Sequence, residues 1–295
     1  MLVRLNSYSS GVIPERLKAI LSEYQYVFNP SFVEHNKKKY LAIRLYDVNS
    51  SSMVSLLFVW VDGGDIQTVN LSEYFNSAEG LLRVSDPKLF IMDGALWGTF
   101  NTGYTETNNN EMVLFELKES KINKYYFCDY AARSRVEKNW AFYVVNNELF
   151  SLYSISPIIV LRAQEFKKNR IIFEQCYFNE SSQYYNYSIG SPMVSVGSRL
   201  LFVAHKKIYC MGKRLYLGRP FTFTHVGKPE LKARKIFLMH SIIALFGCTK
   251  KFNKNLISCT YFSGINYTGS GIQLSYGIND VKWGLATLVP DDLWL

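Results

Sequence analysis

The stretches FNPSFV (Phe28–Val33) and SDPKLFIMDGALWGTF (Ser85–Phe100) share one pattern: a polar residue and a proline come before an apolar run. Two further stretches, EKNWAFYVVNNELFSLYS from Glu137 and IGSPMVSVGSRLLFVAHK from Ile189, follow the same plan. In each, a polar start leads to a short apolar strand, a turn and a second apolar strand. The four starts at 28, 85, 137 and 189 lie 57, 52 and 52 residues apart. A repeat of about 50 residues with three or four strands is typical of a propeller blade.

The repeat predicts an all-β protein, a single five-bladed β-propeller that spans residues 1–295, rather than a sandwich or an open barrel. We expect blades to start near residues 28, 85, 137, 189 and 236. In the fifth blade, SIIALFGCTKK would be the inner strand and GIQLSYGIND the next. One short helix is expected over about residues 13–24, where IPERLKAILSEY places its apolar residues on one face.

The polar strand starts have a structural consequence in such a fold. The innermost strands of a propeller line a central channel, so their starts would meet at one mouth of the channel. We expect the residues at or near these starts to approach one another there: Asn29, Asp86, Asn139, Ser191 and Asp280. Each Asn-Pro, Asp-Pro or Ser-Pro pair alone is equally a turn former. Their shared register favours a common site.

The composition fits a β protein that remains inside the cell. The chain is 48% hydrophobic and 16% aromatic, and aromatic residues favour strands. The longest apolar stretches, MVSLLFVWV and IFLMHSIIALFGC, are shorter than the roughly 20 residues that a membrane-spanning helix needs. The first residues lack the apolar core and small-residue cleavage site of a signal peptide. We therefore expect a cytoplasmic protein, with peripheral contact to an anionic membrane surface as an open possibility.

The positive charge is concentrated in one segment. The net charge is +9, yet Arg199–Lys254 holds 13 Lys and Arg against a single acid, Glu230. Such a field attracts anions such as sugar phosphates, nucleotides or lipid headgroups, although a solvated basic surface is an equal alternative. No nucleic-acid-binding signature accompanies it, so no nucleic-acid partner is expected.

The five cysteines do not indicate a disulfide framework or a zinc site. They are odd in number and widely spaced, without a CxxC pair or a His at zinc-ligand spacing. No Walker or GxGxxG loop and no Asp-x-Asp signature occurs. We therefore expect reduced thiols, no cofactor and no metal.

The motifs together resemble a known family. FNPS followed by Arg44, DPK followed by DGALWGTFNT, EKNW, GSPMVSVGSRLLFVAHK and SYGINDVKWGLATL are similar, in order and spacing, to the five-bladed superfamily of β-1,2-mannoside phosphorylases and related β-mannosyltransferases. The five-bladed furanoside glycosidases are a more distant likeness. Each motif is weak alone, and the set covers nearly the whole chain.

The resemblance implies a set of site residues in this chain. The carboxylates of such enzymes hold the sugar, and their Arg, Lys and His residues hold a phosphate. The implied carboxyl groups are Asp86 and Asp280, and the other implied residues are Asn29, Arg44, Lys88, His205 and Tyr276. From the strand starts EKNW and GSP we add Glu137 as a third candidate catalytic carboxyl group, and Lys138, Asn139 and Ser191 as candidate sugar-binding or phosphate-binding residues. Of these, Arg44, Lys138 and His205 would form a phosphate cradle with Lys88 at its edge.

Two departures from the family pattern bear on this assignment. The phosphorylases carry an Asp after their second-blade YT motif, whereas this chain reads FNTGYTETNNN, with Glu106 nearby. Lys88 stands where the family has Arg, which removes a bidentate fork for phosphate. Structural alternatives also exist: Glu137 and Lys138 as a solvated pair at a turn, His205 as a structural His, and Asp280 as a turn cap.

The leading functional hypothesis is a metal-independent glycosyltransferase. It would move a sugar from a phosphate-bearing donor, such as a nucleotide sugar, to a glycan or glycolipid acceptor. A glycoside phosphorylase or hydrolase is the second hypothesis, because inorganic phosphate or water could occupy the same pocket. A non-catalytic glycan-binding propeller is the third. The sequence does not identify the sugar.

Overall fold

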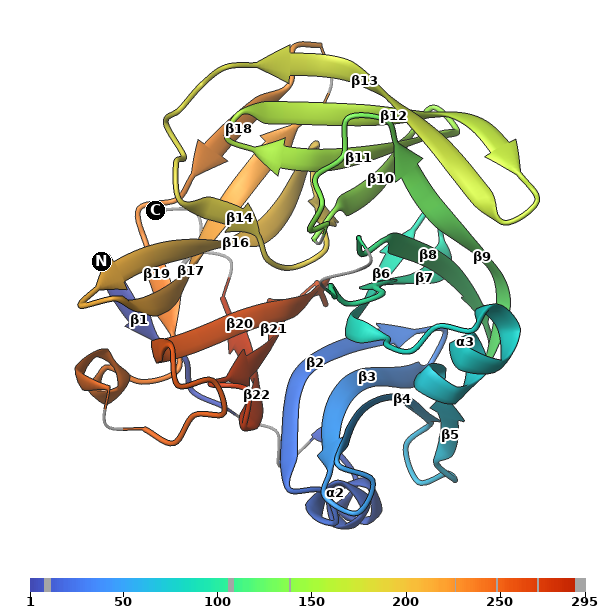
Figure 1. Ribbon diagram of the computed structural model, residues 1–295, viewed down its shortest axis with the longest axis vertical. Coiled ribbons are helices and arrows are strands. Elements are labelled where there is room, and N and C mark those ends of the chain that lie inside the picture. Colours follow the sequence, from blue (N-terminus) through green and yellow to red (C-terminus); the bar gives the residue numbers. More distant parts are fainter. Residues whose placement is uncertain are drawn as a thin grey trace.

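Strands make up most of the protein, and their sheets surround a common centre (Figure 1). The structure is a computed structural model that describes residues 1–7, 12–105, 109–137, 139–225, 227–247, 249–269 and 271–289. These residues include two α-helices, α2 (Glu15–Ser22) and α3 (Leu71–Glu79), and one 3-10 helix, η1 (Ile243–Phe246). The prediction of a mostly β protein is confirmed. The division into five blades remains a prediction, because the strands pair into three larger sheets.

The first sheet holds four antiparallel strands in chain order. They are β2 (Tyr26–His35), β3 (Lys38–Asp47), β4 (Ser52–Trp60) and β5 (Gln67–Asn70). Residues 40–43 of β3 are all buried, and they alternate between two core clusters: Tyr40 and Ala42 belong to one, Leu41 and Ile43 to the other. Because successive strand residues point to opposite faces, both faces of this sheet are covered.

The second sheet consists of two four-stranded meanders joined at their last strands. The strands are β6 (Ser85–Met92), β7 (Ala95–Asn101), β8 (Met112–Lys118), β9 (Lys121–Tyr130), β10 (Ala141–Val145), β11 (Glu148–Ile155), β12 (Ile158–Lys167) and β13 (Arg170–Asn179). Phe127–Tyr130 of β9 pair in parallel with Arg170–Phe173 of β13. The join satisfies two edges that would otherwise expose unpaired backbone groups. The sequence repeat does not predict it.

The third sheet combines the two ends of the chain. Its strands are β1 (Leu2–Arg4), β14 (Tyr187–Ile189), β15 (Val194–Val196), β16 (Arg199–Cys210), β17 (Lys213–Thr224), β18 (Glu230–Ala233), β19 (Phe237–Met239), β20 (Leu256–Tyr267), β21 (Ile272–Ile278) and β22 (Lys282–Leu288). β1 pairs in parallel with β19, and β17 pairs in parallel with the start of β20. These pairings fix the loop before β20 against the β16–β17 hairpin.

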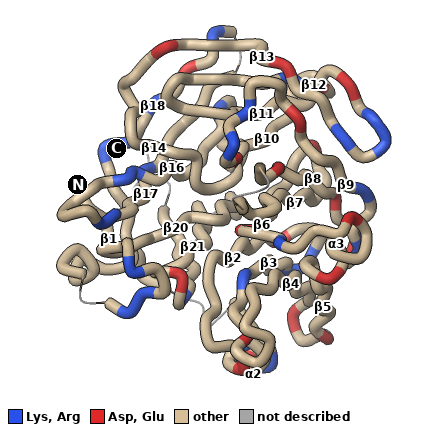
Figure 2. The backbone as a smooth tube through the Cα atoms, in the orientation of Figure 1, with Lys and Arg blue, Asp and Glu red and all other residues tan. Residues whose placement is uncertain are grey.

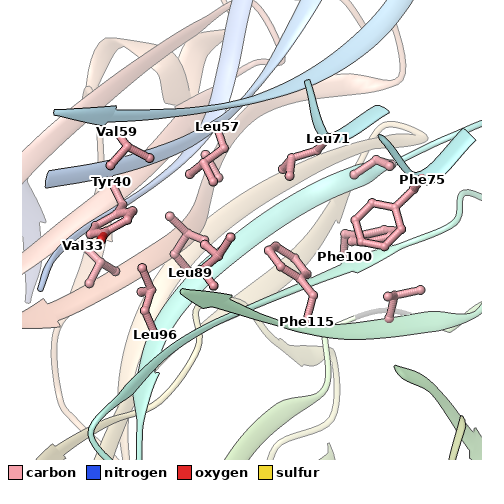
Figure 3. Close-up of a cluster of buried hydrophobic side chains, with 14 of the residues drawn as sticks. Val33, Tyr40, Leu57, Val59, Leu71, Phe75, Leu89, Leu96, Phe100 and Phe115 are labelled. Carbon is pink, nitrogen blue, oxygen red and sulfur yellow. The ribbon is translucent and has the colours of Figure 1, made fainter. Parts of the chain in front are cut away.

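A mixed helix and sheet core holds the first two sheets together. Figure 3 shows Leu57, from the first sheet, above Leu89 and Phe115, from the second, with Phe75 of α3 filling the space beside them. The rings of Phe75 and Phe100 lie 4.6 Å apart. Burial of an aromatic ring of this kind contributes about 1.5–3 kcal/mol, so this packing fixes how β2 and β6 lie relative to each other.

Several predicted boundaries differ from the structure. The helix expected at about 13–24 is α2, Glu15–Ser22, and α3 was not predicted. The third expected strand start, residue 137, precedes β10 by four positions, since β10 begins at Ala141.

The expected inner strand SIIALFGCTKK is wrong. Ile243–Phe246 of this run form η1, and Gly247 ends it in the left-handed conformation at φ 74°. An apolar run without alternation does not by itself distinguish a strand from a helix. The strands that contact β2 from this part of the chain are β20, β21 and β22.

Neither α2 nor α3 has the length and apolar character of a membrane-spanning helix, and no other described helix does.

Candidate functional site

Asn29 and Asp86 occupy the same position in two similar β-bulges. The register of β2 on β3 shifts between Phe28 and Ser31, and that of β6 on β7 shifts between Ser85 and Lys88. The bulge residues Asn29 and Asp86 have φ values of 50° and 52°. Asn and Asp tolerate this left-handed region better than other side-chain-bearing residues. The two stretches are therefore the same piece of local structure.

Two further predicted residues share this backbone conformation. Asn139 has φ 67° and Asp280 has φ 56°. Asp280 follows Asn279, whose Oδ1 accepts hydrogen bonds from Cys259 N at 2.7 Å and Ser258 Oγ at 3.2 Å. Asn279 thereby ties the β21–β22 turn to β20 and positions Asp280. Left-handed non-glycine residues that gather in one place are a feature of functional sites.

Asp86 is the centre of a small polar network. Asn29 Nδ2 donates to Asp86 Oδ1 at 2.9 Å, and Arg44 Nη1 donates to the same oxygen at 3.1 Å. The ion pair is partly open to solvent, with the side chains of Arg44 and Asp86 20% and 18% exposed. Asn29 is held from behind by Gly277, where an added Cβ would lie 2.0 Å from Asn29 Oδ1.

Lys88 is buried behind this network and contacts three segments of the chain, those of Asn139, Gly190 and Tyr261. Its Nζ donates to Asn139 Oδ1 at 2.6 Å and to the carbonyl of Gly190, and it lies 5.6 Å from the ring centre of Tyr261. Tyr261 OH donates to the same Asn139 oxygen at 3.1 Å. Burial, and next the charge of Asp86, raises the pKa of Tyr261 well above its usual value, so its hydroxyl stays protonated.

His205 is buried and already uses one ring nitrogen. Its Nε2 accepts the backbone N–H of Phe262 at 2.7 Å, and its ring stacks on Tyr261 at 4.6 Å. Because Nε2 is an acceptor, the ring proton lies on Nδ1. A positively charged His205 would lose the bond to Phe262. The bond to Phe262 therefore fits a neutral His205.

The polar network borders a cavity of about 640 Å³. Its wall carries two carboxylates, Asp86 and Asp280, together with four cationic side chains and several aromatic rings. The lining residues are Phe28, Asn29, Arg44, Met53, Asp86, Asn139, Ser188, His205, Lys207, Arg214, Tyr216, Phe252, Asn253, Lys254, Leu256, Cys259, Tyr261 and Asp280. The cavity thus combines groups that bind sugar hydroxyls with groups that bind an anion.

The structure brings together about half of the predicted site residues. The predicted residues that line the cavity are Asn29, Arg44, Asp86, Asn139, His205 and Asp280. Those that do not line it are Lys88, Glu137, Ser191 and Tyr276. Lys138 lies outside the described residues.

Glu137 supports the site from behind rather than facing it. Its Oε2 accepts from Trp140 Nε1 at 2.7 Å, and its Oε1 accepts from Tyr153 OH at 2.6 Å and from the backbone N–H of Ser134. Its own N–H donates to Asn110 at 2.5 Å. Both carboxylate oxygens are therefore already hydrogen-bonded beneath the segment that carries Asn139.

Ser191 and Tyr276 also have structural contacts. Ser191 Oγ accepts from Val203 N at 2.9 Å and donates to Pro192 O at 2.8 Å. Tyr276 packs on Phe262 in the core, with its pKa raised by burial. Neither side chain reaches the cavity.

Three cations and a tyrosine are among the cavity residues that were not predicted individually. Lys207, Arg214 and Lys254 belong to the basic segment Arg199–Lys254, so the charge pattern pointed to the segment without selecting them. No sequence pattern indicated Tyr261 as a cavity residue, because its position depends on the contact of β20 with β16.

No group of three or more His, Cys, Asp or Glu side chains among the described residues is arranged to hold a metal ion. The four described cysteines, Cys128, Cys176, Cys210 and Cys259, are free thiols, two of them buried and two exposed.

Comparison with known proteins relates the chain to solved structures only. No family model matches the sequence, and no curated protein matches it. A glycosyl hydrolase from Bacteroides ovatus is 12% identical with a TM-score of 0.59, over 90% of this chain and 85% of that one. The β-1,2-mannobiose phosphorylase of Listeria innocua is 10% identical with a TM-score of 0.59, over 92% and 91%. A GDP-Man-dependent mannosyltransferase from Leishmania mexicana is 11% identical with a TM-score of 0.59, over 91% and 86%. At this identity the likeness shows a shared, β-propeller-like all-β fold.

Proposed function

We propose that the protein is a carbohydrate-active enzyme, a glycosyltransferase that moves a sugar from a nucleotide-sugar donor to a glycan acceptor. The observation that carries the proposal is one cavity with two carboxylates and four cations, Arg44, Lys207, Arg214 and Lys254. The carboxylates suit sugar hydroxyls and proton transfer, and the cations suit a phosphate-bearing leaving group. The structural likeness to a hydrolase, a phosphorylase and a mannosyltransferase agrees with sugar chemistry.

The two carboxylates have different surroundings and therefore different proposed roles. Asp86 forms an ion pair with Arg44, and its carboxylate oxygens suit acceptance of hydrogen bonds from sugar hydroxyls. Asp280 lies in the β21–β22 turn, which Asn279 holds against β20, and it lines the same cavity. We assign Asp280 to proton transfer with the acceptor and Asp86 to the sugar.

The donor phosphates are assigned to the cations of the third sheet. Lys207 and Arg214 come from the β16–β17 hairpin and Lys254 from the loop before β20. The parallel pairing of Arg214 with Leu256 brings the two segments together. Phe252 lies on the same wall, against Tyr26 and Tyr46, and offers a ring on which a base can stack.

We further propose that the chain forms a single domain of five blades that surround this cavity. The three consecutive groups β2–β5, β6–β9 and β10–β13 are each four-stranded and antiparallel, which supports the division. The groups around β16–β17 and β20–β22 would be the fourth and fifth.

The experiment measures binding and transfer with nucleoside diphosphates and a panel of nucleotide sugars. Charge-assisted bonds to phosphate contribute about 1.5–3 kcal/mol each, so Arg214→Ala and Lys254→Ala should each weaken donor binding by about tenfold to a hundredfold. Lys213→Ala is the matched control, because adjacent strand residues point to opposite faces and Lys213 does not line the cavity.

A phosphorylase is the second candidate, since the same four cations suit inorganic phosphate. If the protein acts on a mannoside only when inorganic phosphate is added, it is a phosphorylase and not a transferase. If a glycan binds while no donor is turned over and no variant changes either quantity, the protein is a binding module.

A further inference from the structure

Two loops of the third sheet expose large apolar side chains at one corner of the molecule. The tip of the β16–β17 hairpin exposes Tyr209 (60%) and Met211 (97%). The second loop contains η1, where Ile242 (50%), Ile243 (66%) and Phe246 (77%) are exposed. We call these five residues the apolar corner. Single exposed apolar residues are ordinary, whereas a group of five in two short segments marks an interaction surface.

The two loops form one surface because they pack on each other. Ala244 and Leu245 of η1 share a small core with Ile208 and Leu215, which flank the hairpin tip. The backbone N–H of Arg214 also donates to Asn255 O at 3.0 Å. Figure 1 shows the end of the β16–β17 hairpin and the short η1 coil projecting on the same side, at the left of the view.

Both loops of the apolar corner carry positively charged residues and no acidic residue. Residues 231–279 contain six Lys and Arg and no Asp or Glu. Three lysines of the two loops, Lys213, Lys250 and Lys254, are exposed. Figure 2 shows blue stretches on this side of the molecule and along the loop that leads to β20.

We propose that the apolar corner docks on an anionic lipid surface. Exposed Ile, Phe, Met and Tyr side chains gain free energy when they enter the boundary between headgroups and acyl chains. Nearby lysines add electrostatic attraction to anionic headgroups. A symmetric contact with a second copy is disfavoured by the same charges, because it would bring Lys213 and Lys250 towards their own equivalents.

Docking would also place the cavity beside the lipid surface. Arg214 follows the hairpin tip directly, and Phe252 and Lys254 follow η1, so both loops that carry the corner also form the cavity wall. Resting on the proposed transferase function, this arrangement assigns the acceptor to lipid-linked glycans. The docking itself does not depend on any activity.

The test is sedimentation of the full chain with vesicles of phosphatidylcholine alone or of equal parts phosphatidylcholine and phosphatidylserine. Binding is expected only to the anionic vesicles and should weaken with salt. The double variant Ile242→Ser/Ile243→Ser should lose it. Lys213→Ala and Lys250→Ala should each weaken it about fivefold, the factor that corresponds to about 1 kcal/mol per basic residue.

Leu82→Ser is the matched control, because Leu82 is 86% exposed after α3, outside the corner. It should bind anionic vesicles as the unchanged protein does. Absence of vesicle binding at low salt, equal binding by the Ile242→Ser/Ile243→Ser variant, or an equal loss in Leu82→Ser would overturn the proposal. If the unchanged protein forms dimers and the Ile242→Ser/Ile243→Ser variant does not, the apolar corner instead binds a second copy of the chain. Thermal unfolding of each variant checks that the fold is retained, and retained sugar transfer with lost vesicle binding separates docking from catalysis.

Discussion

Asn29 and Asp86 stand 57 residues apart in the chain, share a left-handed backbone, and are joined by a hydrogen bond of 2.9 Å. One repeated local motif therefore supplies both the donor and the acceptor of the same contact. The bond orients the carboxylate of Asp86 before any substrate arrives. Arg44 donates a second hydrogen bond to the same carboxylate oxygen.

Isosteric replacement of the two cavity carboxylates should affect different quantities, turnover for Asp280 and sugar binding for Asp86. Asp280→Asn removes the proposed proton-transfer group and should lower turnover by about a hundredfold to ten-thousandfold with donor affinity nearly unchanged. Asp86→Asn should mainly weaken sugar binding, by about tenfold to a hundredfold. Steady-state kinetics and equilibrium binding on both variants measure this difference. Equal turnover of Asp280→Asn and the unchanged protein would contradict the role of Asp280.

Glu137→Gln should lower stability more than catalysis. Glu137 accepts bonds from Trp140 and Tyr153 in a buried position, and a Gln presents one oxygen where the carboxylate presents two. The free energy of unfolding should fall by about 1–3 kcal/mol, as measured by chemical denaturation. Turnover per folded molecule should remain within a few-fold. A stable variant with strongly reduced turnover would restore Glu137 as a catalytic candidate.

Gly277→Ala should disturb the site through Asn29. The new Cβ would lie 2.0 Å from Asn29 Oδ1, so Asn29 must move away from Asp86. Sugar binding should weaken, and Asn29→Ala should remove part of the additional loss, because the clashing oxygen is then absent while the 2.9 Å contact with the Asn29 backbone nitrogen remains. A double-mutant cycle of binding free energies measures this coupling. If the losses of binding free energy in Gly277→Ala and Asn29→Ala add in the double variant, Gly277→Ala does not act on sugar binding through Asn29.

Stability should fall in weak acid because of His240. Burial lowers the pKa of His240 from 6.5 to about 4, and Thr260 Oγ1 lies 2.8 Å from its Nδ1. As the pH falls, His240 is protonated in the unfolded chain before it is protonated in the folded protein. The contribution of neutral His240 to the free energy of unfolding is therefore complete above pH 6.5 and is lost as the pH falls towards 4.

The comparison of unfolding free energies uses His240→Gln. After allowance for partial exposure, the unchanged protein should lose about 2 kcal/mol more than the variant between these pH values. Burial also lowers the pKa of His225, so the variant should keep a smaller slope of the same sign. Parallel pH profiles of the two proteins would exclude His240 as the cause.

The sequence alone was sufficient for the features that depend on local pattern. Short apolar runs between turn residues predicted a β protein. The polar strand starts predicted that Asn29, Asp86, Asn139, Ser191 and Asp280 meet at one mouth of the channel. The four Asn and Asp residues have left-handed backbones and line the cavity, and Ser191 does not line it. The concentration of Lys and Arg in Arg199–Lys254 predicted either an anion-binding region or a solvated basic surface, and Lys207, Arg214 and Lys254 of this segment line the cavity.

Tertiary structure decided which of these residues face the same space. Lys88 and Glu137 resemble cavity residues in sequence, yet one ties Asn139 to Gly190 and the other lies beneath Trp140. Arg214, Lys254 and Tyr261 reach the cavity only because β17 pairs with β20 and because β20 lies next to β2 and β6. Pairings between distant strands and the direction of each buried side chain are set by packing across the whole molecule, and no local pattern of residues encodes them.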